Sequence, residues 1–149
     1  MSLQQEVMEK LKEARKAKDS VALESLRAIK SAILLAQTES GASSNLTEDK
    51  ELKILQKLVK QRKDSAAIFM EQDRQDLAQP ELDQAAVIEQ FLPEPLTEEE
   101  IEKVVVATIA QVDAQGMKDM GKVMGIVSKE LAGQADGKTI STIVKKNLM

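Results

Sequence analysis

The sequence predicts an all-α protein made of two helical bundles, with about four helices in the first and three in the second. Apolar residues recur every three to four positions, which is typical of helix faces, whereas the alternation expected of strands is missing. Only six glycines and three prolines interrupt the 149 residues. Aromatic residues are limited to Phe69 and Phe91, so the cores must consist of aliphatic residues and methionine.

The first two helices are predicted from local capping signals. Ser2 and Gln5 have the spacing of a capping box, which places the start of the first helix at Ser2. Asp19 is the expected cap of the second helix. The segment 38–45 is rich in serine and is predicted to be a loop. The apolar face of the first helix consists of Leu3, Val7, Leu11 and Ala14.

The third helix is expected to begin after Thr47 and to cover roughly residues 48–74. Arg74 is expected to bond the last carbonyls of this helix, and Asp76 to cap the next segment. Pro80 suits the first turn of the fourth helix, where a missing N–H costs nothing. The apolar stripe of the third helix is Leu52, Leu55, Val59, Ala66, Phe69 and Met70.

The clearest boundary in the sequence is Pro93-Glu94-Pro95, because two prolines at i and i+2 force an extended backbone and stop a helix. We therefore expect an N-terminal bundle, a linker and a C-terminal three-helix domain at residues 1–92, 93–96 and 97–149. Thr97 and Glu100 form a second capping box, which opens the fifth helix. The sixth helix should begin around Asp119. The candidate caps of the seventh helix are Asp136 and Thr139.

The composition excludes several kinds of chemistry. Neither cysteine nor histidine occurs, which removes disulfides, thiolate nucleophiles and the commonest general base. Phosphate-binding loops and nucleophile elbows are also missing. We interpret the acidic run at 98–102 as first-turn acids that complement a helix dipole, in preference to a metal cluster. The sequence therefore predicts no catalytic residue, no metal and no cofactor.

The N-terminal segment has no apolar core of a signal peptide, and the longest apolar stretch, about residues 104–110, is far too short to span a bilayer. We therefore expect a soluble, cytoplasmic protein with no membrane contact. We also expect a monomer.

Charge is unevenly distributed, and the C-terminal part is basic. Residues 117–149 hold six lysines against three acids, a net charge of +3, whereas residues 81–116 have a net charge of −8. Lys118 and Lys122 flank the predicted start of the sixth helix, and Lys138 lies in the first turn of the seventh. A cation at a helix N-terminus costs about 0.3–1 kcal/mol, which makes these three lysines either candidate phosphate ligands or a solvated surface.

Two further groups of cations complete the candidate sites. Lys145 and Lys146 lie at a predicted helix C-terminus, where the dipole favours them, and they are secondary candidates for phosphate contact. Lys60, Arg62 and Lys63 form a possible second nucleic-acid patch on the third helix. A solvated or ion-paired helix face is the alternative, because adjacent helical residues differ by about 100° and cannot all share one side.

Several segments together resemble the YqeY family. They are Met120-Gly121-Lys122-Val123-Met124, Gly133-Gln134-Ala135-Asp136-Gly137-Lys138, Leu26-Arg27 with Lys30, Arg74 with Asp76-Leu77, and Phe91-Leu92-Pro93. Phe91 departs from the tyrosine that the family pattern leads us to expect. The resemblance implies bundles of four and three helices, the second similar to the tail domain of the GatB subunit of tRNA-dependent amidotransferase.

Proteins of the family that this chain resembles are called amidotransferase-like. The resemblance therefore implies formation of a carbon–nitrogen bond on mischarged tRNA, with glutamine as the amide donor. A helical chain of 149 residues has no room for a glutaminase or a kinase-like cradle. We therefore expect a non-catalytic accessory protein that binds tRNA or associates with an aminoacyl-tRNA or amidotransferase component. The alternatives are a protein–protein adaptor, which docks through residues 81–116 or 60–63, and a subunit with ligase activity only within a complex.

Overall fold

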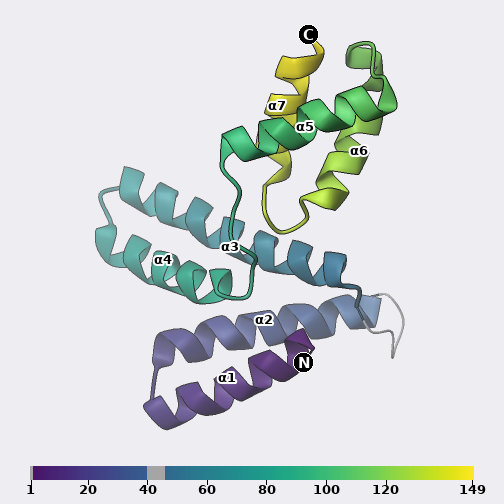
Figure 1. Cartoon of the computed structure of the whole chain (residues 1–149). Helices are drawn as coiled ribbons and strands as arrows, with labels where there is room; N and C mark the ends of the chain where they lie inside the picture. Colours follow the sequence, from purple (N-terminus) through teal and green to yellow (C-terminus); the bar gives the residue numbers. More distant parts are fainter. Residues whose placement is uncertain (1, 40–45) are drawn as a thin grey trace. The chain divides into compact units, whose positions relative to one another are not determined.

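The computed structural model describes residues 2–39 and 46–149, and over these residues it contains helices but no strand (Figure 1). The all-α fold class predicted from the sequence is therefore confirmed. The chain divides into two compact units, Met1–Leu92 and Pro93–Met149. The elements in chain order are α1 (Leu3–Ala17), α2 (Ser20–Glu39), α3 (Glu48–Glu71), α4 (Gln75–Glu89), α5 (Glu98–Val112), η1 (Met117–Asp119), α6 (Met120–Glu130) and α7 (Gly137–Leu148).

The predicted caps of the first three helices are confirmed. The backbone N–H of Gln5 donates to Ser2 Oγ at 3.3 Å, and the Gln5 side chain accepts from the Ser2 N–H at 3.0 Å. Asp19 Oδ1 accepts from the N–H of Ala22 at 3.1 Å, and Thr47 accepts from the first turn of α3 at 3.3 Å. Each bond to a first-turn N–H satisfies a donor that the helix itself cannot pair.

The predicted loop at 38–45 begins later than expected, because Thr38 and Glu39 belong to α2. The hydroxyl of Thr38 donates to the backbone oxygen of Leu34 at 2.9 Å, a local bond that a helical threonine can make with the preceding turn. The remainder of the predicted loop, residues 40–45, lies outside the described residues.

The connection between α3 and α4 corrects three expectations. Helix α3 ends at Glu71 rather than near residue 74, since Asp73 adopts a left-handed conformation with φ of 59°. Arg74 does not bond the last carbonyls through its side chain. Its guanidinium instead donates twice to the carboxylate of Asp76, at 3.0 and 2.9 Å. Met70 lies beyond the packed part of the stripe and is 53% exposed.

Helix α4 begins at Gln75, five residues before Pro80, so that Pro80 lies inside the helix and not in its first turn. Asp76 is correspondingly a first-turn residue rather than a cap. The ring of Pro80 removes the N–H that would reach the carbonyl of Asp76 one turn earlier. The acid at Asp76 complements the helix dipole, which favours this early start.

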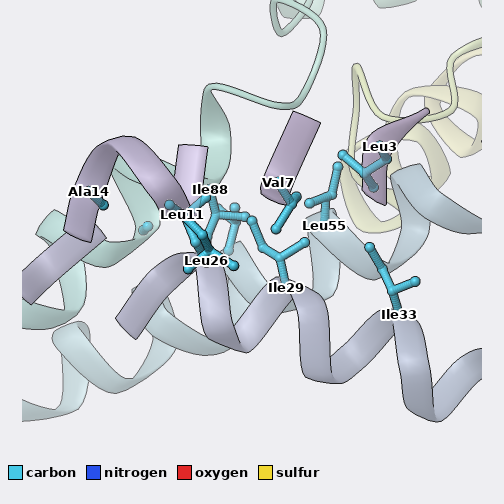
Figure 2. Close-up of a cluster of buried hydrophobic side chains, with 11 residues drawn as sticks. Leu3, Val7, Leu11, Ala14, Leu26, Ile29, Ile33, Leu55 and Ile88 are labelled. Atoms are coloured by element: carbon cyan, nitrogen blue, oxygen red, sulfur yellow. The ribbon is translucent and has the colours of Figure 1, made fainter. Parts of the chain in front are cut away.

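The core of the first unit is aliphatic. Figure 2 shows Val7 and Leu11 of α1 directed toward Leu26 and Ile29 of α2. The same cluster contains Leu3, Ala14, Ile33, Leu55, Val59, Ala85 and Ile88. Residues from all four helices of the unit therefore contribute to one core.

Polar side chains tie α2, α3 and α4 together beside this core. Arg62 of α3 donates to Gln84 of α4 at 3.1 Å, and Gln84 donates in turn to Glu24 of α2 at 2.9 Å. The guanidinium of Arg62 also donates to the backbone oxygen of Leu58 at 3.1 Å. Arg62 is therefore a structural residue that connects α3, through Gln84, to the rest of the first unit.

The second unit packs α5, α6 and α7 against one another around a separate aliphatic core. Thr97 caps α5 by accepting from the N–H of Glu100 at 3.2 Å, and Asp136 caps α7 by accepting from Thr139 at 2.6 Å. The carboxylate of Glu100 bonds the Thr97 hydroxyl rather than its N–H, so this capping box is half formed. The core residues are Ile101, Val105, Val123, Val127, Leu131, Ile140, Ile143, Val144 and Leu148.

Candidate nucleic-acid interface

The antiparallel packing of α6 and α7 determines at which end of the second unit each candidate lysine lies. The two helices contact each other and are joined by a short connection, so the start of α6 lies near the end of α7 (Figure 1). Gly116 confirms this arrangement, because a Cβ added there would lie 4.0 Å from the backbone oxygen of Leu148. Lys118 and Lys122 are thus near the end of the unit that holds Lys145, and Lys138 is at the opposite end.

The sequence predicted phosphate ligands at helix N-termini, and the structure places Lys122 and Lys138 in the first turns of α6 and α7. These two N-termini do not meet. Lys122 and Lys138 therefore cannot hold one phosphate together, although they can contact different phosphates along an extended polyanion.

The side chains of Lys118, Lys122, Lys138 and Lys145 are exposed to solvent. No ion pair ties up any of these four ammonium groups within the described part of the chain. Lys146 differs, because its Nζ lies 3.9 Å from Glu102 Oε1 of α5. The Lys146 side chain is nevertheless 73% exposed, and a surface pair of this kind contributes little.

Two acids near these lysines accept hydrogen bonds from the backbone. Asp119 accepts from the backbone N–H of Gln115 at 2.9 Å, and Asp136 accepts from the N–H of Thr139 at 2.6 Å. Both carboxylates thus accept from backbone N–H groups near the starts of helices. The positive charge of the lysines remains available to a ligand in solution.

Lys129 is an additional cation that the sequence reasoning missed. It is exposed on α6, and it follows Lys122 by seven residues, so the two side chains share one face of the helix. Lys138 and Lys145 have the same seven-residue spacing on α7. At about 1.5 Å of rise per residue, each row is about 10 Å long. The i, i+7 spacing is the sequence signal that could have identified Lys129.

The lysine row of α7 lies on the side of that helix toward α6. Lys146 marks the side of α7 that faces α5, because its ammonium group approaches Glu102. Lys145 lies about 100° from Lys146 around the helix, on the side toward α6. Packed helices lie about 8–10 Å apart, which is therefore the approximate separation of the two helix axes that carry the lysine rows.

Two glycines lie on the exposed face of α6, next to the lysines. Gly121 and Gly125 are exposed, and a Cβ added at either position would meet no atom within 4 Å. Neither glycine has the positive φ that requires this residue. The result is a strip of bare helix backbone beside Lys122 and Lys129.

The possible second patch has partners within the first unit. Lys60 Nζ lies 2.7 Å from Asp64, and Lys63 Nζ lies 2.6 Å from Glu89 of α4. Arg62 is held by Gln84. The geometry of these three residues therefore corresponds to the paired helix face that was the alternative to a nucleic-acid patch.

Two carboxyl groups of the first unit have shifted pKa values. Partial burial raises the pKa of Glu51, and the nearby charges of Glu48 and Glu6 raise it further. The hydrogen bond from Arg74 lowers the pKa of Asp76, with a contribution from the guanidinium charge.

Over the residues that the structure describes, no cluster of three or more candidate ligand residues is arranged to hold a metal ion. None of the described helices is long and apolar enough to cross a bilayer.

A family model described as Yqey-like protein matches residues 4–148 of this chain. The chain belongs to the YqeY-like family. The resemblance inferred from its sequence segments is thereby confirmed.

Two curated relatives share part of the sequence. A glutamyl-tRNA(Gln) amidotransferase subunit of Thermococcus gammatolerans is 37% identical over 73 residues, which cover 46% of this chain and 12% of that subunit. The altered inheritance of mitochondria protein 41, mitochondrial, of Clavispora lusitaniae is 38% identical over 82 residues, which cover 55% of this chain and 46% of that protein. The chain thus spans less than half the length of either relative.

Proposed function

We propose that this YqeY-like protein is a non-catalytic accessory protein that binds tRNA through the lysines of η1, α6 and α7 and acts in association with an amidotransferase. The observation that carries the proposal is the exposed, unpaired state of Lys118, Lys122, Lys138 and Lys145 among the described residues. The similarity to a subunit of glutamyl-tRNA(Gln) amidotransferase supports the choice of tRNA as ligand. A cytoplasmic location and a monomeric state are part of the same proposal.

The second unit is suited to contact an RNA backbone rather than to read bases. Both phenylalanines of the chain lie in the first unit, and the chain has no tryptophan or tyrosine, so the second unit offers no ring on which a base could stack. Lysines on two neighbouring helices can instead follow phosphates across a structured RNA, which proteins recognise largely by shape. Binding would be sequence-tolerant and sensitive to salt.

Charge reversal tests the assignment. Lys122→Glu combined with Lys138→Glu should weaken tRNA binding by at least about tenfold at low salt, since each change replaces a phosphate contact with repulsion. The matched control is Lys103→Glu, at an exposed lysine on α5 outside the two rows, which should have a smaller effect. Unchanged affinity in the double variant would show that Lys122 and Lys138 do not contact tRNA and would contradict the proposed site.

An enzyme function is the second candidate, because the matching relative is an amidotransferase subunit. The accessory proposal predicts that the purified chain neither hydrolyses glutamine nor transfers an amide to aminoacyl-tRNA. Turnover in either assay, lost on removal of the protein, would contradict it.

A further inference from the structure

The outer side of the α1–α2 pair carries a second cationic surface, on the first unit. We call this surface the α1–α2 seam. Its residues are Met8, Lys12 and Arg15 of α1, and Arg27, Lys30 and Leu34 of α2. It lies in a different unit from the tRNA interface proposed above, and it goes beyond that function.

One hydrogen bond shows which side of each helix faces the other. Gln4 of α1 donates to Gln37 of α2 at 3.4 Å. At about 100° per residue, Met8, Lys12 and Arg15 lie within about 80° of Gln4 around α1. By the same rule, the α2 residues of the seam lie within about 80° of Gln37. The six side chains therefore share one surface along the two helices.

The acids of both helices lie on other sides. Glu13 of α1 is about 180° from Gln4 and pairs with Lys10 at 3.5 Å. Glu24 of α2 accepts from Gln84 of α4 at 2.9 Å, so it faces α4. Glu6, Glu9 and Glu39 are also about 140–200° from the glutamine on their own helix. The seam thus has four cations and no carboxylate.

The seam is exposed and its cations are unpaired. All four basic side chains are exposed, and none takes part in an ion pair over residues 2–39 and 46–149. Met8 and Leu34 expose 43% and 48% of their surface. The core beneath is already filled by other side chains of the same helices, which point inward in Figure 2. Met8 and Leu34 are therefore available to a partner.

We propose that the α1–α2 seam is a docking site for an acidic amphipathic helix of a partner protein. A third helix can pack along two neighbouring helices, and its apolar stripe would cover Met8 and Leu34. Acids on both flanks of that stripe would meet Lys12 and Arg15 on one side and Arg27 and Lys30 on the other, which gives charge complementarity. A polyanion without apolar groups would gain nothing from Met8 and Leu34.

The probe is a synthetic 18-residue helical peptide with leucine at i, i+3 and i+4 positions and glutamate on both flanks, titrated into the full chain. Saturable binding is expected, with NMR shifts at the methyl group of Met8 and the amides of the seam. Arg27→Ser with Lys30→Ser should weaken binding about tenfold, and Leu34→Ser several-fold. Lys53→Ser with Lys57→Ser removes two exposed cations from α3 and should leave binding unchanged.

Three further probes distinguish the kind of partner. A peptide of the same charge without leucine, a duplex RNA, and vesicles of mixed phosphatidylserine and phosphatidylcholine should each move the seam signals less than the leucine peptide. The proposal is overturned if the leucine peptide causes no shifts at millimolar concentration, if the α3 control weakens it equally, or if RNA or vesicles bind the seam more tightly. Helical circular dichroism identifies any variant that has lost its fold.

Discussion

Replacing Gly125 with alanine should stabilise the protein and at the same time weaken RNA binding. Gly125 lies in the interior of α6, is exposed, and has no atom within 4 Å of an added Cβ. A glycine in a helix interior is less favourable than alanine by about 0.8–1.0 kcal/mol. Since the new methyl group meets nothing inside the protein, the full gain, about 1 kcal/mol in the free energy of unfolding, should be observed.

The same methyl group would lie on the strip of bare backbone beside Lys122 and Lys129. A phosphate backbone that approaches α6 closely there would be displaced, and the affinity for tRNA should fall by about three- to tenfold. Urea unfolding of the full chain measures the first effect, and a fluorescence titration with tRNA measures the second. Ala107→Gly, at an exposed position on α5, is the reverse control, which should destabilise the chain without changing tRNA affinity.

A loss of stability in Gly125→Ala would refute the reasoning, because it would mean that the exposed face of α6 is covered within the protein. Stabilisation with unchanged tRNA affinity would agree with the helix propensity argument, but it would show that tRNA does not contact this face of α6.

Three further predictions concern the fold. Asp136→Ala removes the side chain that accepts from Thr139 at the start of α7, and should lower the free energy of unfolding by about 1 kcal/mol, whereas the exposed Thr142→Ala on the same helix should change it less. Ile29→Ala empties a fully buried position in the first core and should cost about 2–5 kcal/mol in a denaturant titration. Burial and neighbouring acids raise the pKa of Glu51, so folding favours the protonated form of this side chain. The contribution of Glu51 to stability is therefore lost as the pH rises from 4.5, the usual pKa of this carboxyl, through its higher pKa in the folded chain. Glu51→Gln should therefore be more stable than the original chain at neutral pH, and the difference in stability should be smallest well below pH 4.5. Thermal unfolding of both proteins over a series of pH values measures this difference, and the opposite trend would contradict the prediction.

The features of the fold that depend on neighbouring residues were predicted from the sequence. Ser2, Asp19 and Thr47 cap helices through side chains that bond backbone groups three residues away, so no tertiary knowledge was needed. Pro80 was misplaced for a related reason. Proline is favoured in the first turn of a helix, but α4 begins earlier, because the left-handed Asp73 ends the preceding turn and Asp76 supplies an acid in the first turn of α4.

The arrangement of the candidate site could be predicted only in part. The exposure of a lysine follows from its position opposite the apolar stripe, but the separation of Lys122 from Lys138 depends on the antiparallel packing of α6 and α7. The partner of Lys63 comes from α4, 26 positions farther along the chain. The α1–α2 seam was hidden because basic and acidic residues alternate along α1, and only the contact between Gln4 and Gln37 shows which of them face α2.

The dependence of tRNA affinity on salt tests the central claim most directly. If five of the six exposed lysines in residues 117–149 contact phosphates, the logarithm of the association constant should fall with the logarithm of salt concentration with a slope of about −3.5 to −4.5. In Lys122→Glu with Lys138→Glu, the loss of two phosphate contacts should make the slope shallower by about 1.4 to 1.8. A slope near zero, or the same slope in both proteins, would contradict the account.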